Sequence, residues 1–166
     1  MSKKPRLRTV EKSLPPFPLN EFPKDFPFIL GKELVYLLAS KGKAILEGSE
    51  FEAIFATCIC AEWKPSNVGL DDIILGNTAW GAKTVKATNP ATQKKVRLIS
   101  GRNSPVYSFG ETIDTHHDSN AVGQSVLEIW NERVSAVREK FQNLRTVVLV
   151  KSNDLTEVVV FEFDTI

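Results

Sequence analysis

The feature that most constrains the fold is a short turn between two apolar runs in the middle of the chain. Gly76 and Asn77 separate the run 73–75 from the run 79–85. A two-residue turn of this composition between apolar runs is typical of a tight β-hairpin. The sequence therefore predicts two adjacent antiparallel strands, around which the other segments are expected to pack.

An acidic pair and a lysine flank this turn. Asp71 and Asp72 precede the first apolar run, and Lys83 lies within the second. Strand pairing would place Asp72 and Lys83 opposite each other, where a carboxylate and an ammonium can hold a divalent cation and orient an attacking water. Two plainer explanations stay open, because aspartate is common in turns and a strand lysine can lie on the solvent face.

Length and composition are those of a globular domain. The 166 residues fit one domain with a sizeable core, and 42% hydrophobic and 25% charged residues are ordinary values. No apolar run approaches the roughly 18 residues of a membrane span, and the N-terminus lacks the apolar core of a secretory signal. Cys58 and Cys60 lack zinc-ligand spacing. These features predict a cytoplasmic protein.

Charge is segregated along the chain, although the formal net charge is only +1. No acidic residue occurs between Asp72 and Glu111, and this stretch is strongly basic. Such a segment beside an acidic pair suits a phosphate polymer held close to metal-binding carboxylates, whereas ordinary solvated surface is the alternative. The basic residues are Lys83, Lys86, Lys94, Lys95, Arg97 and Arg102.

The apolar periodicity of residues 29–166 predicts an α/β domain. Residues 1–28 are basic and rich in proline and phenylalanine, and this composition predicts an extended arm. The apolar strand that ends close to Ile166 favours a fragment of a longer chain. Ser49 and Glu52 have the spacing of a helix capping box. Beyond the hairpin, helices are expected at 29–40, 49–63 and 120–142, and strands at 96–100, 146–151 and 157–163.

The predicted elements follow the order helix–strand–strand–strand–helix–strand, with an acid at the hairpin and a lysine on its second strand. This arrangement resembles the PD-(D/E)XK nuclease superfamily, type II restriction endonucleases in particular. The segment GSEFE at residues 48–52 is similar to the helix opening of Mrr-like restriction enzymes. The resemblance spans roughly residues 48–163. It implies a restriction-endonuclease-like fold, a mixed β-sheet flanked by helices with an αβββαβ core.

The resemblance also implies site residues. Asp72 matches the metal-binding aspartate, Lys83 the lysine of the second-strand motif, and Glu52 the helix glutamate, so Asp72 and Glu52 would bind Mg²⁺. The chain departs from the family at Gly81, where a carboxylate usually stands two residues before the lysine. Either another carboxylate replaces it or activity is lost. The candidate replacements are Glu52, Asp71, Glu111 and Glu128, of which Glu52 is preferred.

The implied function is Mg²⁺-dependent hydrolysis of duplex DNA in the restriction of foreign DNA, with a two-fold homodimer left open. One alternative is a catalytically inactive or truncated DNA-binding domain of the same fold. Another is a protein-assembly subunit that uses the arm and exposed strand edges. The residues expected to contact DNA are Lys86, Lys94, Lys95, Arg97, Arg102 and Asn103.

Overall fold

The computed structural model describes residues 13–65, 69–96, 98 and 119–165. Its centre is a five-stranded mixed sheet in the order β1-β2-β3-β4-β5. All neighbouring strands are antiparallel except β3 and β4, which are parallel. The strands are β1 (Glu62–Trp63), β2 (Ile73–Leu75), β3 (Thr78–Lys86), β4 (Asn143–Lys151) and β5 (Val158–Asp164).

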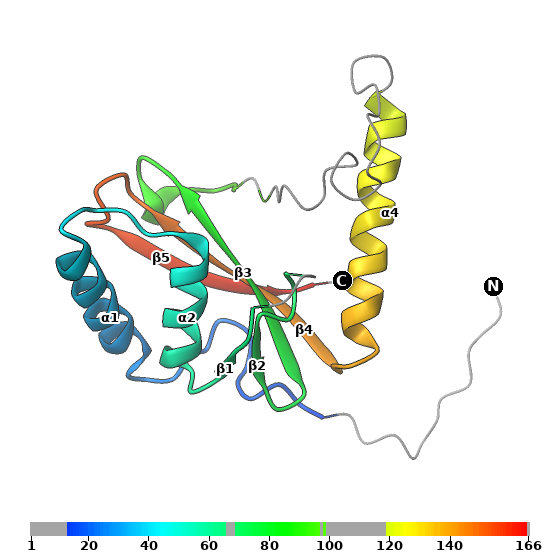
Figure 1. Ribbon diagram of the computed structural model, residues 1–166, viewed down its shortest axis with the longest axis horizontal. Helices are drawn as coiled ribbons and strands as arrows, with labels where there is room; N and C mark the ends of the chain where they lie inside the picture. Colours follow the sequence, from blue (N-terminus) through cyan, green and yellow to red (C-terminus); the bar gives the residue numbers. More distant parts are fainter. Residues whose placement is uncertain (1–12, 66–68, 97, 99–118, 166) are drawn as a thin grey trace.

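Helices pack on both faces of this sheet, one of them only near the start of β3 and β4 (Figure 1). Helices α1 (Phe26–Lys41) and α2 (Gly48–Cys58) lie together on one face, and α4 (Ser119–Arg138) lies on the other. A short 3₁₀ helix, η1 (Pro90–Thr92), follows β3. Parallel strands cannot be joined by a tight turn, and α4 lies in the crossover between β3 and β4. The expected α/β class is therefore confirmed.

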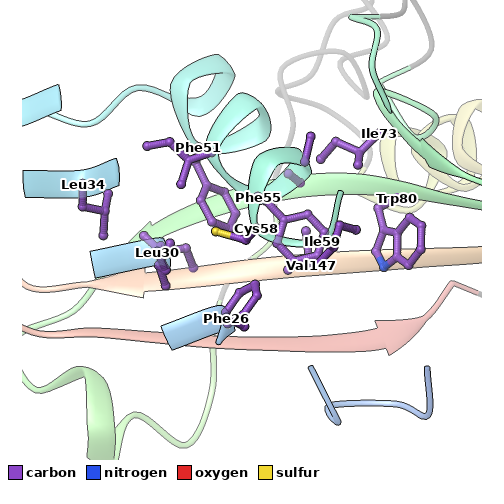
Figure 2. Close-up of a cluster of buried hydrophobic side chains, with 14 of the residues drawn as sticks. Phe26, Leu30, Leu34, Phe51, Phe55, Cys58, Ile59, Ile73, Trp80 and Val147 are labelled. Carbon is purple, nitrogen blue, oxygen red and sulfur yellow. The ribbon is translucent and has the colours of Figure 1, made fainter. Parts of the chain in front are cut away.

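The larger core lies between the sheet and the α1–α2 pair, as Figure 2 shows. Phe51 and Phe55 of α2 are fully buried there, and the ring of Phe55 meets Trp80 of β3, also fully buried, edge-on with centroids 6.3 Å apart. Burial of three aromatic side chains is a large share of the hydrophobic stabilisation of a domain of this size. A second, smaller core joins α4 to the other face through Leu70, Ala79, Val134, Val137 and Leu144.

The predicted hairpin is present, with Leu75 paired to Thr78 across the turn. Gly76 adopts a φ of 59°, a left-handed conformation that glycine reaches without a Cβ clash. The two final strands also form where expected, but β4 begins at Asn143, three residues before the predicted strand. Local sequence therefore identifies these strands well.

Three predicted boundaries differ from the structure. Helix α1 begins at Phe26 rather than 29, because Pro27 falls in the first turn, where its missing N–H costs nothing. Helix α2 ends at Cys58 rather than 63, since Cys60 adopts a left-handed φ of 55° and Glu62–Trp63 become β1. The described residues of the predicted strand at 96–100, Val96 and Leu98, are not in a strand.

The described part of the N-terminal arm packs on the domain itself. The ring of Phe17 stacks on Trp80 with centroids 5.9 Å apart, and Phe22 stacks on Phe26 at 4.4 Å. The backbone N–H of Ser13 donates to the side chain of Gln142. The phenylalanines of the arm therefore extend the hydrophobic core across the sheet.

Candidate functional site

The acidic pair lies in the short segment that leads into β2. Asp71 and Asp72 are both buried, with 7% and 5% of their surfaces exposed. The carbonyl of Asp72 accepts a hydrogen bond from the backbone N–H of Lys64, so the segment continues the pairing between β1 and β2. Carboxylates are rarely buried to this extent unless cations or hydrogen-bond donors compensate the lost hydration. Two adjacent buried aspartates are therefore a candidate cation site.

A lysine from the end of the α4 segment approaches one of the two aspartates. The Nζ of Lys140 lies 3.8 Å from Oδ2 of Asp71. The Lys140 side chain is largely exposed, so solvent screens this pair and its contribution to stability is small. The contact nevertheless brings the Asp71 carboxylate close to the turn that follows α4.

Gly81 lies where the packing leaves little room for a side chain. A Cβ at Gly81 would lie 3.1 Å from the carbonyl oxygen of Gly69 and 3.1 Å from Cα of Leu70. The backbone of residues 69–70 therefore occupies the space into which a side chain at position 81 would project. The same segment carries Asp71 and Asp72 into this region, so the carboxylates come from the crossing chain and not from β3.

Lys83 lies on the same face of β3 as Gly81. Side chains alternate along a strand, and Trp80 and Ala82 face the α1–α2 core while Ala79 faces α4. Lys83 is accordingly on the α4 side, partly buried. Since Ile73 pairs with Trp80, the next step of the hairpin brings Asp72 beside Gly81. The register therefore sets Gly81, and not Lys83, opposite Asp72, so the expected direct pairing of Asp72 with Lys83 is wrong by two residues.

Glu52 is placed elsewhere. It lies on α2, the helix that packs against the opposite face of the sheet from Lys83, and its Oε2 accepts a hydrogen bond of 3.3 Å from Nε1 of Trp63. The sheet therefore separates Glu52 from the face that carries Lys83. The capping box expected at Ser49 and Glu52 is also wrong, because the reciprocal hydrogen bonds of this helix start are made by Glu47 and Glu50.

The other candidate carboxylates give no alternative among the described residues. Glu128 is on an exposed face of α4, where its Oε1 accepts a hydrogen bond from Gln124, and Glu111 lies outside the described residues. In the parts of the chain that the structure describes, no three His, Cys, Asp or Glu side chains form a metal-binding group. Asp71 and Asp72 therefore make the candidate cation site with two carboxylates.

The predicted DNA-contacting residues are only partly within the described chain. Lys86, Lys94 and Lys95 are exposed at and after the end of β3. Arg97, Arg102 and Asn103 lie outside the described residues. These exposed lysines follow Lys83 along the chain and give the end of β3 and the segment after it a positively charged surface.

A buried lysine beside this basic end was not predicted. Lys151 pairs with Lys86 in the β3–β4 register and is 6% exposed. Its Nζ donates to the backbone carbonyl of Leu46. Burial, and secondarily the charge of Lys86, lowers the pKa of Lys151 below its ordinary value. The single Lys in an otherwise apolar strand, TVVLVK, is the sequence signal that could have singled it out.

The sequence also gave no indication of a buried ion pair behind Trp80. Nη1 of Arg145 lies 2.7 Å from Oε1 of Glu162, and Nε1 of Trp80 donates to Oε2 of Glu162 at 2.8 Å. Burial raises the pKa of Glu162, and the hydrogen bond from Trp80 partly offsets this shift. The backbone N–H of Asn20 also donates to Glu162. This network fixes β3, β4, β5 and the N-terminal arm to one another and so supports the hairpin.

Comparisons of the chain with protein family models, with curated proteins and with solved structures found no match. Among the described residues, no helix is long and apolar enough to cross a membrane.

Proposed function

We propose that this protein is a metal-dependent endonuclease that hydrolyses phosphodiester bonds of duplex DNA in the cytoplasm, as part of the restriction of foreign DNA. The observation that carries the proposal is the segment 69–72. Gly69 and Leu70 pack against Gly81, two residues before Lys83, and the two aspartates that follow them are buried. An acidic pair near a half-buried lysine suits chemistry on a phosphate, because the carboxylates can bind a cation and the ammonium can stabilise the negative charge of the phosphate.

The topology supports a restriction-endonuclease-like assignment of the fold. From α2 onwards the elements follow the order helix, three strands, helix, strand, with β1, β2 and β3 antiparallel and β4 parallel to β3. This is the αβββαβ order of the superfamily. Because β1 precedes the hairpin, the acidic pair opens the second strand and Lys83 lies on the third.

We propose that Asp71 and Asp72 hold a magnesium ion. Mg²⁺ is usually held by one or two carboxylates, with phosphate and water as the remaining ligands, and Asp71 and Asp72 supply two buried carboxylates. When bound, the ion neutralises phosphate charge and lowers the pKa of a water nucleophile. We propose Asp71, in place of Glu52, as the second carboxylate, because Glu52 lies across the sheet from Lys83.

Lys83 would act on the phosphate itself. Its ammonium, partly buried on the α4 side, can donate hydrogen bonds to non-bridging phosphate oxygens and stabilise the charge that develops on them in the transition state. Outside the site, positive charge would hold the DNA backbone in place without reading its sequence. The proposed contacts are Lys86, Lys94, Lys95, Arg97, Arg102 and Asn103.

A catalytically inactive DNA-binding domain of the same fold is the second candidate. The glycine at position 81 and the placement of Glu52 favour it, because each removes a carboxylate that the family uses. Such a domain would keep the basic surface and bind DNA with a steep dependence on salt. It would not cleave DNA with any divalent cation.

The deciding experiment is cleavage of supercoiled plasmid by the purified chain in Mg²⁺, with EDTA as the metal control. Asp72→Asn keeps the shape of the side chain but removes its charge, and we expect cleavage to fall by at least about 100-fold. Lys83→Ala should reduce it similarly. Glu139→Gln, at an exposed position beyond α4, is the matched control and should cut like the parent.

Three outcomes separate the candidates. Cleavage that is lost in EDTA and in Asp72→Asn, but kept in Glu139→Gln, supports the nuclease. Salt-sensitive DNA binding without cleavage supports the inactive domain. If the chain neither cuts nor binds DNA, both are wrong and the protein-assembly role is left.

A further inference from the structure

Helix α1 is apolar on both of its faces. Its inner face buries Phe26, Leu30 and Leu34 against the core. Its outer face exposes Phe28 and Tyr36, with 76% and 73% of their surfaces accessible. A surface helix normally carries polar residues on its outer face, and a helix that is apolar all round is normally covered on both sides. The outer face of α1 therefore has the composition of an interface.

The exposed residues share one face of the helix. The large exposed side chains of this face are Phe28, Val35 and Tyr36. Two small residues lie on the same face: Gly31, between Phe28 and Val35, and Ala39, one turn after Val35. An open hollow follows this face between the large side chains. A Cβ at Gly31 would meet no atom within 4 Å, so the hollow is open at that residue.

We propose that this α1 face binds the same face of a second copy of the chain, with the two helices antiparallel about a two-fold axis. The large and small residues are symmetric about one point, between Glu33 and Leu34. Antiparallel packing about that point sets Phe28 of each copy over Ala39 of the other and Tyr36 of each over Gly31 of the other. These two pairs, and Lys32 opposite Val35, all share the same centre.

The pairing of large with small residues selects a second copy of the chain over an unrelated partner. A two-fold interface uses one patch twice, so it needs a surface that complements itself. The two aromatic side chains, Phe28 and Tyr36, each find a small residue at the symmetry-related position, which allows the helices to approach closely. Antiparallel helices also bring the positive end of each macrodipole towards the negative end of the other.

The area is sufficient for a weak specific dimer. Phe28, Val35 and Tyr36 are each about 70% exposed or more. With the stem of Lys32 and Pro27 at the edge, the contact would bury on the order of 500 Å² on each copy, which is near the lower end of specific interfaces. We therefore expect a dissociation constant in the micromolar range, with the dimer prominent at tens of micromolar.

Sedimentation velocity of the full chain, from about 1 to 100 μM, tests this proposal. Ala39→Phe places a large ring where the Phe28 of the second copy should lie, and should weaken association by at least about ten-fold although it adds apolar surface. The double variant Phe28→Ala/Ala39→Phe exchanges the large and small partners and should restore association to within about three-fold of the parent. Ser135→Phe, on the exposed side of α4, is the control and should leave association unchanged.

Restored association in the double variant, together with the loss in Ala39→Phe, would establish the two-fold packing. A chain that stays monomeric at about 100 μM would overturn the proposal and leave the face to a different protein. A dimer that is indifferent to Ala39→Phe, or that the double variant fails to restore, would also overturn it. Circular dichroism of each variant confirms that α1 is still folded.

Discussion

Replacing Gly81 with alanine places one methyl group where the chain crosses in front of β3. The new Cβ would lie 3.1 Å from the carbonyl oxygen of Gly69, 3.1 Å from Cα of Leu70 and 3.4 Å from Cδ2 of Leu70. Comfortable contacts between such atoms are about 3.5–4.0 Å. Two of the three neighbours are backbone atoms, and the same segment continues into buried Asp71 and Asp72, so relief requires movement of the segment and not rotation of a side chain.

The cost follows from these distances. Overpacking by one methyl group in a tightly packed site typically destabilises by about 1–3 kcal/mol. Alanine also restricts the unfolded chain relative to glycine, which returns about 0.4–1 kcal/mol. The net loss in the free energy of unfolding should be roughly 1–2 kcal/mol, equivalent to a fall in Tm of about 2–8 °C for a domain of this size.

Urea denaturation followed by circular dichroism measures this change, and Gly123→Ala is the matched control. Gly123 lies within α4 and a Cβ there would meet no atom within 4 Å. Because glycine is unfavourable inside a helix, Gly123→Ala should stabilise the protein by about 0.5–1 kcal/mol. The two substitutions should therefore have opposite signs.

Gly81→Glu tests the same packing at the candidate site. It places a carboxylate two residues before Lys83, the spacing found in the nuclease superfamily that the sequence resembles. We expect this variant to be destabilised more than Gly81→Ala and to gain no cleavage activity, because the glutamate would displace the segment that carries Asp71 and Asp72. A neutral or stabilising Gly81→Ala, or a Gly81→Glu variant with more activity than the parent, would refute the idea that residues 69–70 fill this space.

Two further predictions concern the buried ion pair and a surface turn. Arg145→Met leaves the Glu162 carboxylate buried without its cation, and should lower the free energy of unfolding, measured by urea denaturation, by about 3–5 kcal/mol. The double variant Arg145→Met/Glu162→Met should recover much of that loss. Equal stability of the two variants would contradict this explanation. Asp154 accepts hydrogen bonds from Ser152 and Thr156, which lower its pKa from 3.8 to about 2. A lowered pKa contributes stability above the unfolded value that is lost as pH falls through the folded one. The Tm of Asp154→Asn should therefore lie below that of the parent at pH 6, and the difference should close between about pH 4 and pH 2; a difference independent of pH would show that the ionised carboxylate is not the cause.

Several parts of the fold follow from local sequence alone. The Gly76-Asn77 turn specifies the hairpin because glycine reaches the required left-handed conformation without a clash. The apolar periodicity of α4 and the two final apolar runs predict a long helix and two strands, and these form close to the expected positions. In each case neighbouring residues carry the information, so no distant contact is needed.

The placement of the candidate site is only partly local. A two-residue turn fixes the register of the hairpin, and that register sets Asp72 opposite Gly81, two residues before Lys83. Glu52 could not be placed in this way, since its short motif says nothing about which face of the sheet α2 would cover. The separation of Glu52 from Lys83 is a result of how the helix packs on the sheet.

The sequence by itself determined the elements that short-range chemistry controls: the hairpin, the amphipathic helices and the two final strands. The tertiary structure alone decided what depends on contacts between distant segments. It placed residues 69–70 against Gly81, paired β3 with β4 in parallel and buried Arg145 with Glu162. The physical reason is that backbone conformation responds to neighbouring residues, whereas burial and the exclusion of a side chain depend on which segments the whole chain brings together.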